Sequence, residues 1–90
     1  MSHKEKYIAD IFKSIGHPIR LKIIRLIYEH QTLSVTHLQQ LLKISQPVIS
    51  LHLGILKSKN IINLNKKGKH SFYFIEKSSI PQVIQILFYD

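Results

Sequence analysis

Two groups of polar side chains in the middle of the sequence have the chemistry to bind a long anion. Gln46 and Ser50 are four residues apart, so on a helix both point from one face. A glutamine can hydrogen-bond to adenine through two atoms, and a serine can bond a base edge or a phosphate. Lys66, Lys67 and Lys69 follow downstream, and a lysine is a point charge that suits phosphate better than a base. These residue types predict duplex DNA as the ligand.

The distribution of charge supports an anionic partner. The chain has 13 Lys and Arg against 5 Asp and Glu, a formal net charge of +8. Residues 30–75 contain no acidic residue, yet they hold six lysines. A basic run is often only a solvated face. The prediction of DNA binding therefore depends on how the structural elements arrange these residues.

Length and composition exclude several classes of protein. A chain of 90 residues is enough for one modest core, so we expect a single domain over residues 1–90. Cysteine is absent, which excludes disulfides, thiol redox chemistry and thiolate metal sites. No carboxylate pair, Ser/His/acid set or glycine-rich phosphate loop is present, so we do not expect an enzyme.

The sequence also predicts where the protein works. No apolar run approaches the roughly 20 residues that span a bilayer. The polar start, residues 1–6, lacks the apolar stretch of a secretory signal. We therefore expect a cytoplasmic protein with no membrane partner.

Apolar periodicity predicts two helices before the central segment. The first is amphipathic and ends at Gly16, and Pro18 opens the second, which is the expected spine of the core. The apolar stripe of the first helix consists of Tyr7, Ile8, Ile11, Phe12 and Ile15. The second helix is expected to bury Ile19, Ile23, Ile24, Leu26 and Ile27 and to turn Arg20, Lys22, Arg25 and Glu29 outward.

The central segment has the pattern of a helix-turn-helix, over about residues 35–58. A third helix follows the β-favouring link 32–35, with Ser34 or Thr36 as its cap. A tight turn over 43–45 leads to a fourth helix that Ser45 can cap. The inner face of this helix carries Ile49, Leu53 and Leu56, and the opposite face carries Gln46, Val48, Ser50 and Leu51.

The remainder predicts a hairpin and a last helix. Residues 61–64 and 71–75 are β-type runs on either side of a lysine-rich turn with Gly68, which predicts a wing over about 61–75. A terminal helix over about 79–89 follows Ser78. The expected fold class is mainly α with a small β-hairpin: a winged helix-turn-helix of five helices with a two-stranded wing.

The terminal helix is apolar around most of its circumference, which is more than so short a helix can bury alone. Together with the stripe on the first helix it predicts the subunit interface of a homodimer. The simpler alternative is that both helices only complete the core. The expected interface residues are Tyr7, Ile8, Ile11, Val83, Ile84, Leu87 and Phe88.

With this order of elements, the sequence resembles the ArsR/SmtB-type winged-helix transcriptional repressors over nearly its whole length. Residues 16–24 are similar to the "HP-x-R" helix start of that family, and residues 33–38 fall on its third helix. Residues 45–53 resemble the recognition segment. Lys67, Gly68 and Lys69 with Tyr73 resemble the wing and the aromatic strand behind it.

The resemblance implies a homodimer whose recognition helices enter successive major grooves, roughly 34 Å apart, and which represses by blocking a promoter. We expect Gln46 and Ser50 to read bases, and Pro47 and Val48 to contact thymine methyls unless Val48 packs inward. The expected contacts to the DNA backbone are Ser45, His52, Lys57, Lys66, Lys67, Lys69 and His70.

Two positions on the fourth helix stay open. Leu51 stands where the family commonly has a basic residue, so either it meets a thymine methyl or the helix sits differently in the groove. The matching histidine of the family lies near the DNA backbone, which is the basis for placing His52 there. A lone histidine on a half-apolar face is equally well explained as a packed, hydrogen-bonded residue.

The residues that the family uses to bind metals are missing. Its thiolate site on the third helix falls on Ser34 and Thr36, and a hydroxyl does not replace a thiolate for soft metals. Its other site, on the terminal helix, uses His and carboxylates, which residues 78–89 lack. His30 and His37 flank a turn and could converge, but no histidine pair has helical spacing. We expect no metal and no cofactor, and the inducer stays unknown: a small ligand, a protein partner, pH or none.

A protein-interaction module is the alternative function, with an acidic or an apolar protein as the partner. Leu51 and Val48 on the supposed DNA face favour it. The lysines favour DNA, because protein interfaces are depleted in lysine. The dependence of affinity on salt concentration distinguishes the two functions, because phosphate contacts release counterions and an apolar interface does not.

Overall fold

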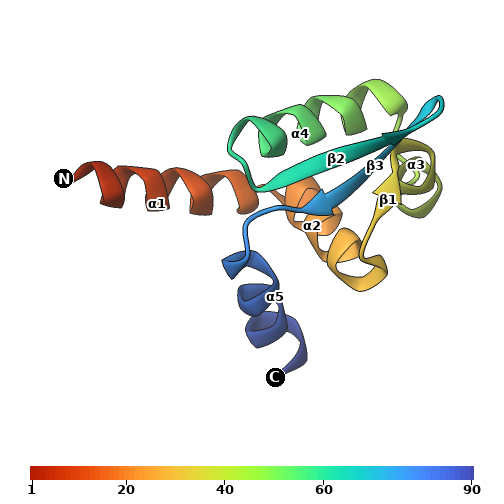
Figure 1. The fold of residues 1–90 in the computed structure, drawn as a ribbon. Helices are drawn as coiled ribbons and strands as arrows, with labels where there is room; N and C mark the ends of the chain where they lie inside the picture. Colours follow the sequence, from red (N-terminus) through yellow and green to blue (C-terminus); the bar gives the residue numbers. More distant parts are fainter.

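The fold is that of a computed structural model, which describes all residues from 1 to 90 (Figure 1). In chain order the elements are α1 (His3–Ile15), α2 (Pro18–His30), β1 (Leu33–Ser34), α3 (Val35–Leu42), α4 (Gln46–Ser58), β2 (Ile62–Lys67), β3 (His70–Ile75) and α5 (Ser79–Tyr89). The predicted winged helix-turn-helix with five helices is confirmed. The structure adds the short strand β1.

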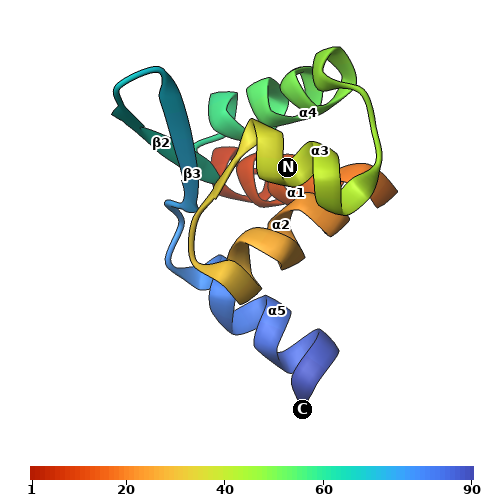
Figure 2. The same ribbon diagram turned by 90° about the vertical axis from the view of Figure 1, so that its right-hand side faces the viewer.

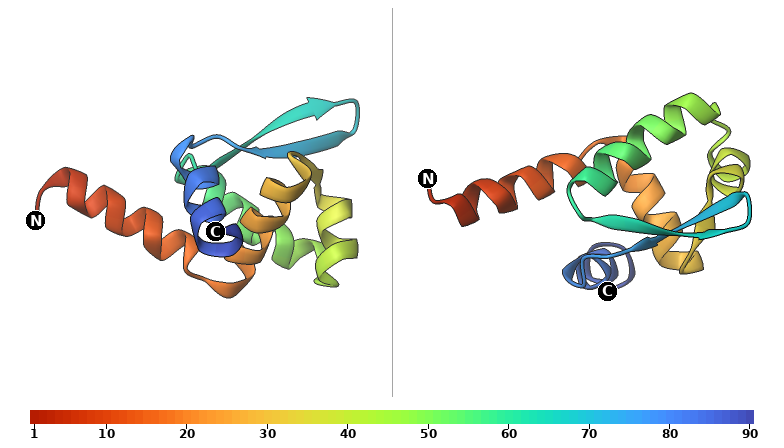
Figure 3. Two further views of the ribbon diagram at one scale, coloured as in Figure 1. Left: turned by 90° about the horizontal axis from the view of Figure 1, so that it is seen from below. Right: turned by 45° about the horizontal axis from the view of Figure 1, so that its top comes forward.

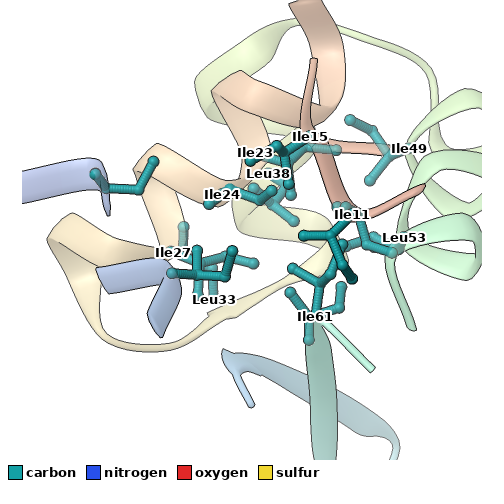
Figure 4. Packing of buried hydrophobic residues seen from close by; sticks show 14 residues of the cluster. Ile11, Ile15, Ile23, Ile24, Ile27, Leu33, Leu38, Ile49, Leu53 and Ile61 are labelled. Atoms are coloured by element: carbon teal, nitrogen blue, oxygen red, sulfur yellow. The ribbon is translucent and has the colours of Figure 1, made fainter. Parts of the chain in front are cut away.

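The hydrophobic core forms around α2. Its Ile23, Ile24 and Ile27 are completely buried (Figure 4). The fourteen buried apolar residues are all isoleucine or leucine, and every element except β3 supplies at least one of them. Ile19 and Leu26, which were expected inside, pack only against the rim of this cluster. All elements therefore take their position from the apolar face of one helix.

The start of α2 is fixed by the residues that precede it. His17 is the N-cap, and its Nδ1 accepts a hydrogen bond from the Ile19 N–H at 3.1 Å. Pro18 follows in the first helical position, where a backbone N–H would have no partner inside the helix. The short break between α1 and α2 is thus a helix stop followed at once by a helix start.

The helix-turn-helix begins with a capped helix. Ser34 Oγ accepts from the His37 N–H at 3.2 Å, so Ser34 and not Thr36 caps α3. Ser45 occupies the N-cap position of α4, but its side chain makes no capping hydrogen bond, and the same holds for Ser78 before α5. The prediction that Ser45 caps through its hydroxyl is therefore wrong. This hydroxyl remains available for a hydrogen bond to a ligand.

The wing is part of a three-stranded antiparallel sheet of order β1-β3-β2. Lys67 pairs with His70 across the hairpin, and Gly68 in the turn has φ +62°, a left-handed conformation that costs glycine little. On its other side β3 pairs with β1, where Leu33 lies opposite Tyr73. The sequence predicted a β-favouring link over 32–35 but not its pairing with β3, because two residues are too few to show a period.

The elements leave two distinct ends on the molecule. The wing tip, α3 and the first turn of α4 lie at one end, and α1 projects from the other (Figures 1 and 3). α5 packs beside α2, away from α3 and α4 (Figure 2). None of the helices combines the length and the apolar content that crossing a membrane requires.

Replacing Ile24 by Ala should lower the free energy of unfolding by roughly 2–5 kcal/mol, because the side chain is completely buried within a cluster of apolar side chains. Urea unfolding followed by circular dichroism measures this change. The matched control is Ile86→Ala, at a side chain that is 62% exposed, which should change stability by less than about 0.5 kcal/mol. Equal losses in both variants would contradict the assignment of the core.

Candidate nucleic-acid interface

The two predicted base readers are neighbours on the outer face of α4. Gln46 Nε2 donates a hydrogen bond to Ser50 Oγ at 2.7 Å, which confirms that both side chains leave the same face of the helix. The Gln46 carbonyl oxygen and the second amide hydrogen stay available to a ligand. An amide and a hydroxyl held side by side can together meet the donor and acceptor pattern of a base edge.

The rest of this face is apolar, and at one position it has no side chain. Pro47 is exposed, Val48 is 37% exposed and Leu51 is 61% exposed, so Val48 is not a core residue. Gly54 lies one turn after Ser50, and no atom comes within 4 Å of the position that a Cβ would take there. A face of this shape allows the helix backbone to approach a partner closely.

The wing carries unpaired positive charge. Lys66, Lys67, Lys69 and His70 are all exposed. The structure has two salt bridges, Arg25 with Glu29 and Lys59 with Asp10, so no carboxylate neutralises the lysines of the wing. Unpaired ammonium groups close to a sheet end are suited to contact phosphates.

A polar cavity of about 190 Å³ joins the wing to the start of α3. Four hydroxyl groups, the Lys69 ammonium and the His70 ring belong to its lining. The lining residues are Ser34, Val35, Thr36, Lys69, His70, Ser71 and Tyr73. Sequence analysis missed Thr36 and Ser71 as site residues, because nothing in the local pattern shows that β3 comes to lie against the start of α3.

His52 lies inside the fold. It is buried, and its Nδ1 is 3.3 Å from Arg20 NH1. Its ring centroid lies 4.7 Å from that of His17. We therefore do not retain His52 as a contact to the DNA backbone: of the two open alternatives, the structure favours the packed residue.

Arg20 was expected to face outward, and this is wrong. It is partly buried, and besides its contact with His52 its Nε donates to the carbonyl oxygen of Ser14 at 2.6 Å. The guanidinium thus connects the end of α1, the first turn of α2 and the middle of α4. Burial lowers the pKa of His52 below its ordinary value of 6.5, and the charges of His17 and Arg20 lower it further.

Two other predicted backbone contacts lie at the ends of α4. Ser45 is exposed immediately before its first turn, next to Gln46. Lys57 is exposed in the last turn, at the opposite end of the helix from Gln46. Of these two, Ser45 is the one that lies next to the predicted base readers.

An apolar surface lies between α1 and α5. A cavity of about 250 Å³ separates the two helices, and seven of its nine lining residues are hydrophobic. Tyr7, Ile8 and Phe12 of α1 and Leu87 of α5 expose large parts of their side chains. Among the expected interface residues, Val83 and Ile11 line the cavity.

Two expected interface residues have contacts within the chain. Ile84 is 1% exposed and belongs to the core, so the prediction that it contacts a partner is wrong. Phe88 has the Arg25 guanidinium 4.3 Å from the centre of its ring. The apolar periodicity of α5 could not separate these roles, because nearly all positions of the helix are apolar.

The histidines do not assemble into a recognisable metal site. His30 and His37 both line one cavity of about 390 Å³. His37 Nδ1 is 3.0 Å from Ser34 Oγ. No group of three or more His, Asp or Glu residues could hold a metal ion.

Comparison with known proteins gives consistent results. A family model described as "Bacterial regulatory protein, arsR family" matches residues 17–63. An HTH-type transcriptional regulator of Methanocaldococcus jannaschii is 39% identical over 92% of this chain and 96% of its own length. The transcriptional repressor PagR of Bacillus anthracis is 33% identical over 97% of this chain and 92% of its own length.

Solved structures agree with the sequence matches. The crystal structure of PagR has a TM-score of 0.85 and covers 93% of this chain and 95% of its own. HlyU from Vibrio cholerae has a TM-score of 0.89 at 25% identity, with coverage of 97% and 94%. The names of these relatives describe transcriptional regulators and not enzymes.

Proposed function

The chain belongs to the arsR family of bacterial regulatory proteins, and we propose that it is a homodimeric, sequence-specific repressor that binds double-stranded DNA without a metal or thiol signal. One observation supports this function above the others. The hydrogen-bonded pair Gln46 and Ser50 lies on the surface at the same end of the molecule as a wing whose lysines have no acidic partner. The proposed unit is a single domain over residues 1–90 that works in the cytoplasm.

In the proposed complex the first turns of α4 enter the major groove, with Gln46 and Ser50 at base edges. Pro47, Val48 and Leu51 offer apolar surface to thymine methyls, and the absence of a side chain at Gly54 lets the helix lie close to the DNA. Leu51 therefore takes part through contact area, where the family commonly has a charge.

The wing and the start of α3 supply the proposed contacts to the backbone. Lys66, Lys67 and Lys69 meet phosphates as point charges. The cavity between Thr36, His70 and Ser71 has hydroxyl donors and adjacent positive charge, and a phosphate oxygen accepts from both. These contacts carry no base information, so they should set affinity and orientation.

The proposed dimer covers the apolar surface of α1 and α5. Exposed Tyr7, Ile8, Phe12 and Leu87 leave an apolar area around the cavity between the helices that water would otherwise contact. A two-fold dimer places two copies of α4 on one face of the duplex, roughly 34 Å apart.

We propose repression and not activation, because a protein can repress a promoter simply by occupying it. PagR, which is named a transcriptional repressor, is 33% identical to this chain, whereas HlyU, which is named an activator, is 27% identical. A thiol signal has no residue to act on, since the chain has no cysteine. The inducer is not part of the proposal.

The double variant Gln46→Ala/Ser50→Ala should lose most of its preference for the specific duplex, by about ten to a hundredfold, and keep non-specific affinity. The specific duplex is obtained by selection from a random library, and fluorescence anisotropy compares it with a scrambled duplex. Gln40→Ala/Ser58→Ala is the control, with the same residue types at other surface positions. Equal weakening on both duplexes would contradict the assignment of Gln46 and Ser50 as base readers.

Replacing Lys66, Lys67 and Lys69 together by Ala should reduce the slope of log affinity against log salt by about 0.9 for each phosphate that these lysines neutralise in the wild-type complex. The measurement is a salt titration with the specific duplex. Replacing Lys4, Lys6 and Lys13 of α1 removes the same net charge and should leave the slope nearly unchanged. A wild-type affinity that does not respond to salt would refute DNA binding and support the protein-interaction alternative.

Leu87→Glu should convert the dimer to a monomer, because it places a charge in the apolar surface between the subunits. Sedimentation equilibrium measures the mass, and the affinity for the specific duplex should fall with it. Leu41→Glu, a similarly exposed leucine on α3, is the matched control and should remain dimeric. A wild-type protein that is monomeric at the concentrations used would overturn the proposed assembly.

A further inference from the structure

We propose that Arg20 is a positioning residue for DNA reading, which holds the recognition helix α4 in place through His52 and does so only while His52 is neutral. The inference rests on the proposed function. It adds a residue that touches no DNA, and a proton as the signal that weakens sequence recognition.

Arg20 is the only charged group that contacts α1 and α4 at the same time from α2. Its Nε donates to the carbonyl oxygen of Ser14 at 2.6 Å, in the last turn of α1, where helix carbonyls lack partners within the helix. Its NH1 lies 3.3 Å from His52 Nδ1. The planar guanidinium can serve both acceptors at once, which a lysine ammonium on its flexible stem cannot do with the same geometry.

His52 is the single polar side chain on the buried face of α4. Its neighbours on that face, Ile49, Leu53 and Leu56, are apolar and fully or almost fully buried. Apolar contacts fix how far α4 lies from the core, but they are non-directional and tolerate small shifts along the helix axis. A hydrogen bond is directional. The Arg20–His52 contact therefore fixes the position of α4, and with it the position of Gln46 and Ser50.

The contact requires a defined protonation state. Arg20 has no acceptor atom, so His52 Nδ1 must be unprotonated to accept from it. The neighbouring His17 is held in place by the hydrogen bond that its Nδ1 accepts from the Ile19 N–H at the start of α2. A proton on His52 would place two donors, both positively charged, 3.3 Å apart.

No acidic group acts on His52 to stabilise its protonated form. The charged or titratable groups that act on His52 are His17 and Arg20, both from α2 and its cap. Of the two acids of α1, Asp10 forms an ion pair with Lys59 and Glu5 accepts from the Ser2 hydroxyl. His37 of α3 contacts Ser34, and the lysines of β2 lie at its exposed wing end.

The direction of the pH effect follows from this environment. Because burial lowers the pKa of His52 in the folded protein, His52 is neutral at pH 7 and its contact with Arg20 is complete there. An unfolded chain binds the proton more readily, so the stabilising contribution is lost as the pH falls below 6.5. Surface histidines act in the opposite direction on affinity, since their protonation adds positive charge.

The test separates these two effects by using a ratio. The affinity for the selected duplex is divided by the affinity for a scrambled duplex, at about pH 7.5 and about pH 5. Protonation of exposed histidines strengthens binding to both duplexes, so its effect cancels in the ratio. A displaced α4 weakens binding to the selected duplex alone and lowers the ratio. For the wild-type protein the ratio should fall about tenfold on acidification, the size of one hydrogen bond to a charged group.

Two variants identify the residues. His52→Asn retains an acceptor near the position of Nδ1 and cannot titrate, so its ratio should not change with pH. Arg20→Lys keeps the charge and should show the low ratio already at neutral pH. Arg25→Lys, the same change on α2 away from α4, and His3→Asn, which removes an exposed histidine at the start of α1, should both keep the wild-type ratio and its pH response. All measurements are made where circular dichroism shows each variant folded.

The outcomes are distinguishable from failure of the proposed function. A wild-type protein that prefers no selected duplex refutes the proposed function, and the inference falls with it. A wild-type preference that is unchanged at acid pH, or that survives Arg20→Lys, overturns the inference and leaves the function intact. A pH response that persists in His52→Asn also overturns it, because the proton then acts elsewhere.

Discussion

The structure depends on the burial of one helix face. Ile23, Ile24 and Ile27 of α2 are completely buried. The other elements bury their apolar residues against this face or against one another around it. A chain of this length has material for a single core, so no element has an independent way to bury its apolar side. This constraint explains why α3 and α4 have a fixed relation to the wing: Leu33, Leu38 and Ile62 enter the same cluster from three different elements. It also explains why α1 and α5 keep exposed apolar surface, since the core offers room for only a part of each.

The sequence predicted the parts of this arrangement that have a period or a local signal. Helix order, the turn before Gln46 and the glycine of the wing were all visible, because each depends on residues close in the chain. The errors concern residues whose role is set by partners far away. Arg20 looks like a solvent-facing residue of an amphipathic helix, and only the approach of α4 turns it into a connector. Ile84 and Leu87 are both apolar residues of α5, yet Ile84 is buried in the core cluster and Leu87 is exposed.

The same limit applies to the candidate site. Gln46 and Ser50 could be paired from their spacing, and the hydrogen bond between them agrees. The cavity at Thr36 and Ser71 could not be anticipated, because it depends on the pairing of a two-residue strand with β3. Serine at position 34 shows how a position can change its use while the fold persists. This residue falls where the resemblance implied a thiolate metal site, and its hydroxyl caps α3 and contacts His37.

The order of the strands has a consequence for the lysines of the wing. Because β3 is paired on both sides, β2 is an outer strand of the sheet, with backbone groups along one side that no other strand satisfies. Such an edge is a template on which a second chain can add a strand and start aggregation, and lysines are a common protection against it. Lys66 and Lys67 are at the end of this edge, so the charges proposed for phosphate also repel a second copy of the strand. Lys66 and Lys67 should therefore favour solubility as well as the proposed affinity for phosphate, and neutral side chains at these positions should promote aggregation even in the absence of DNA.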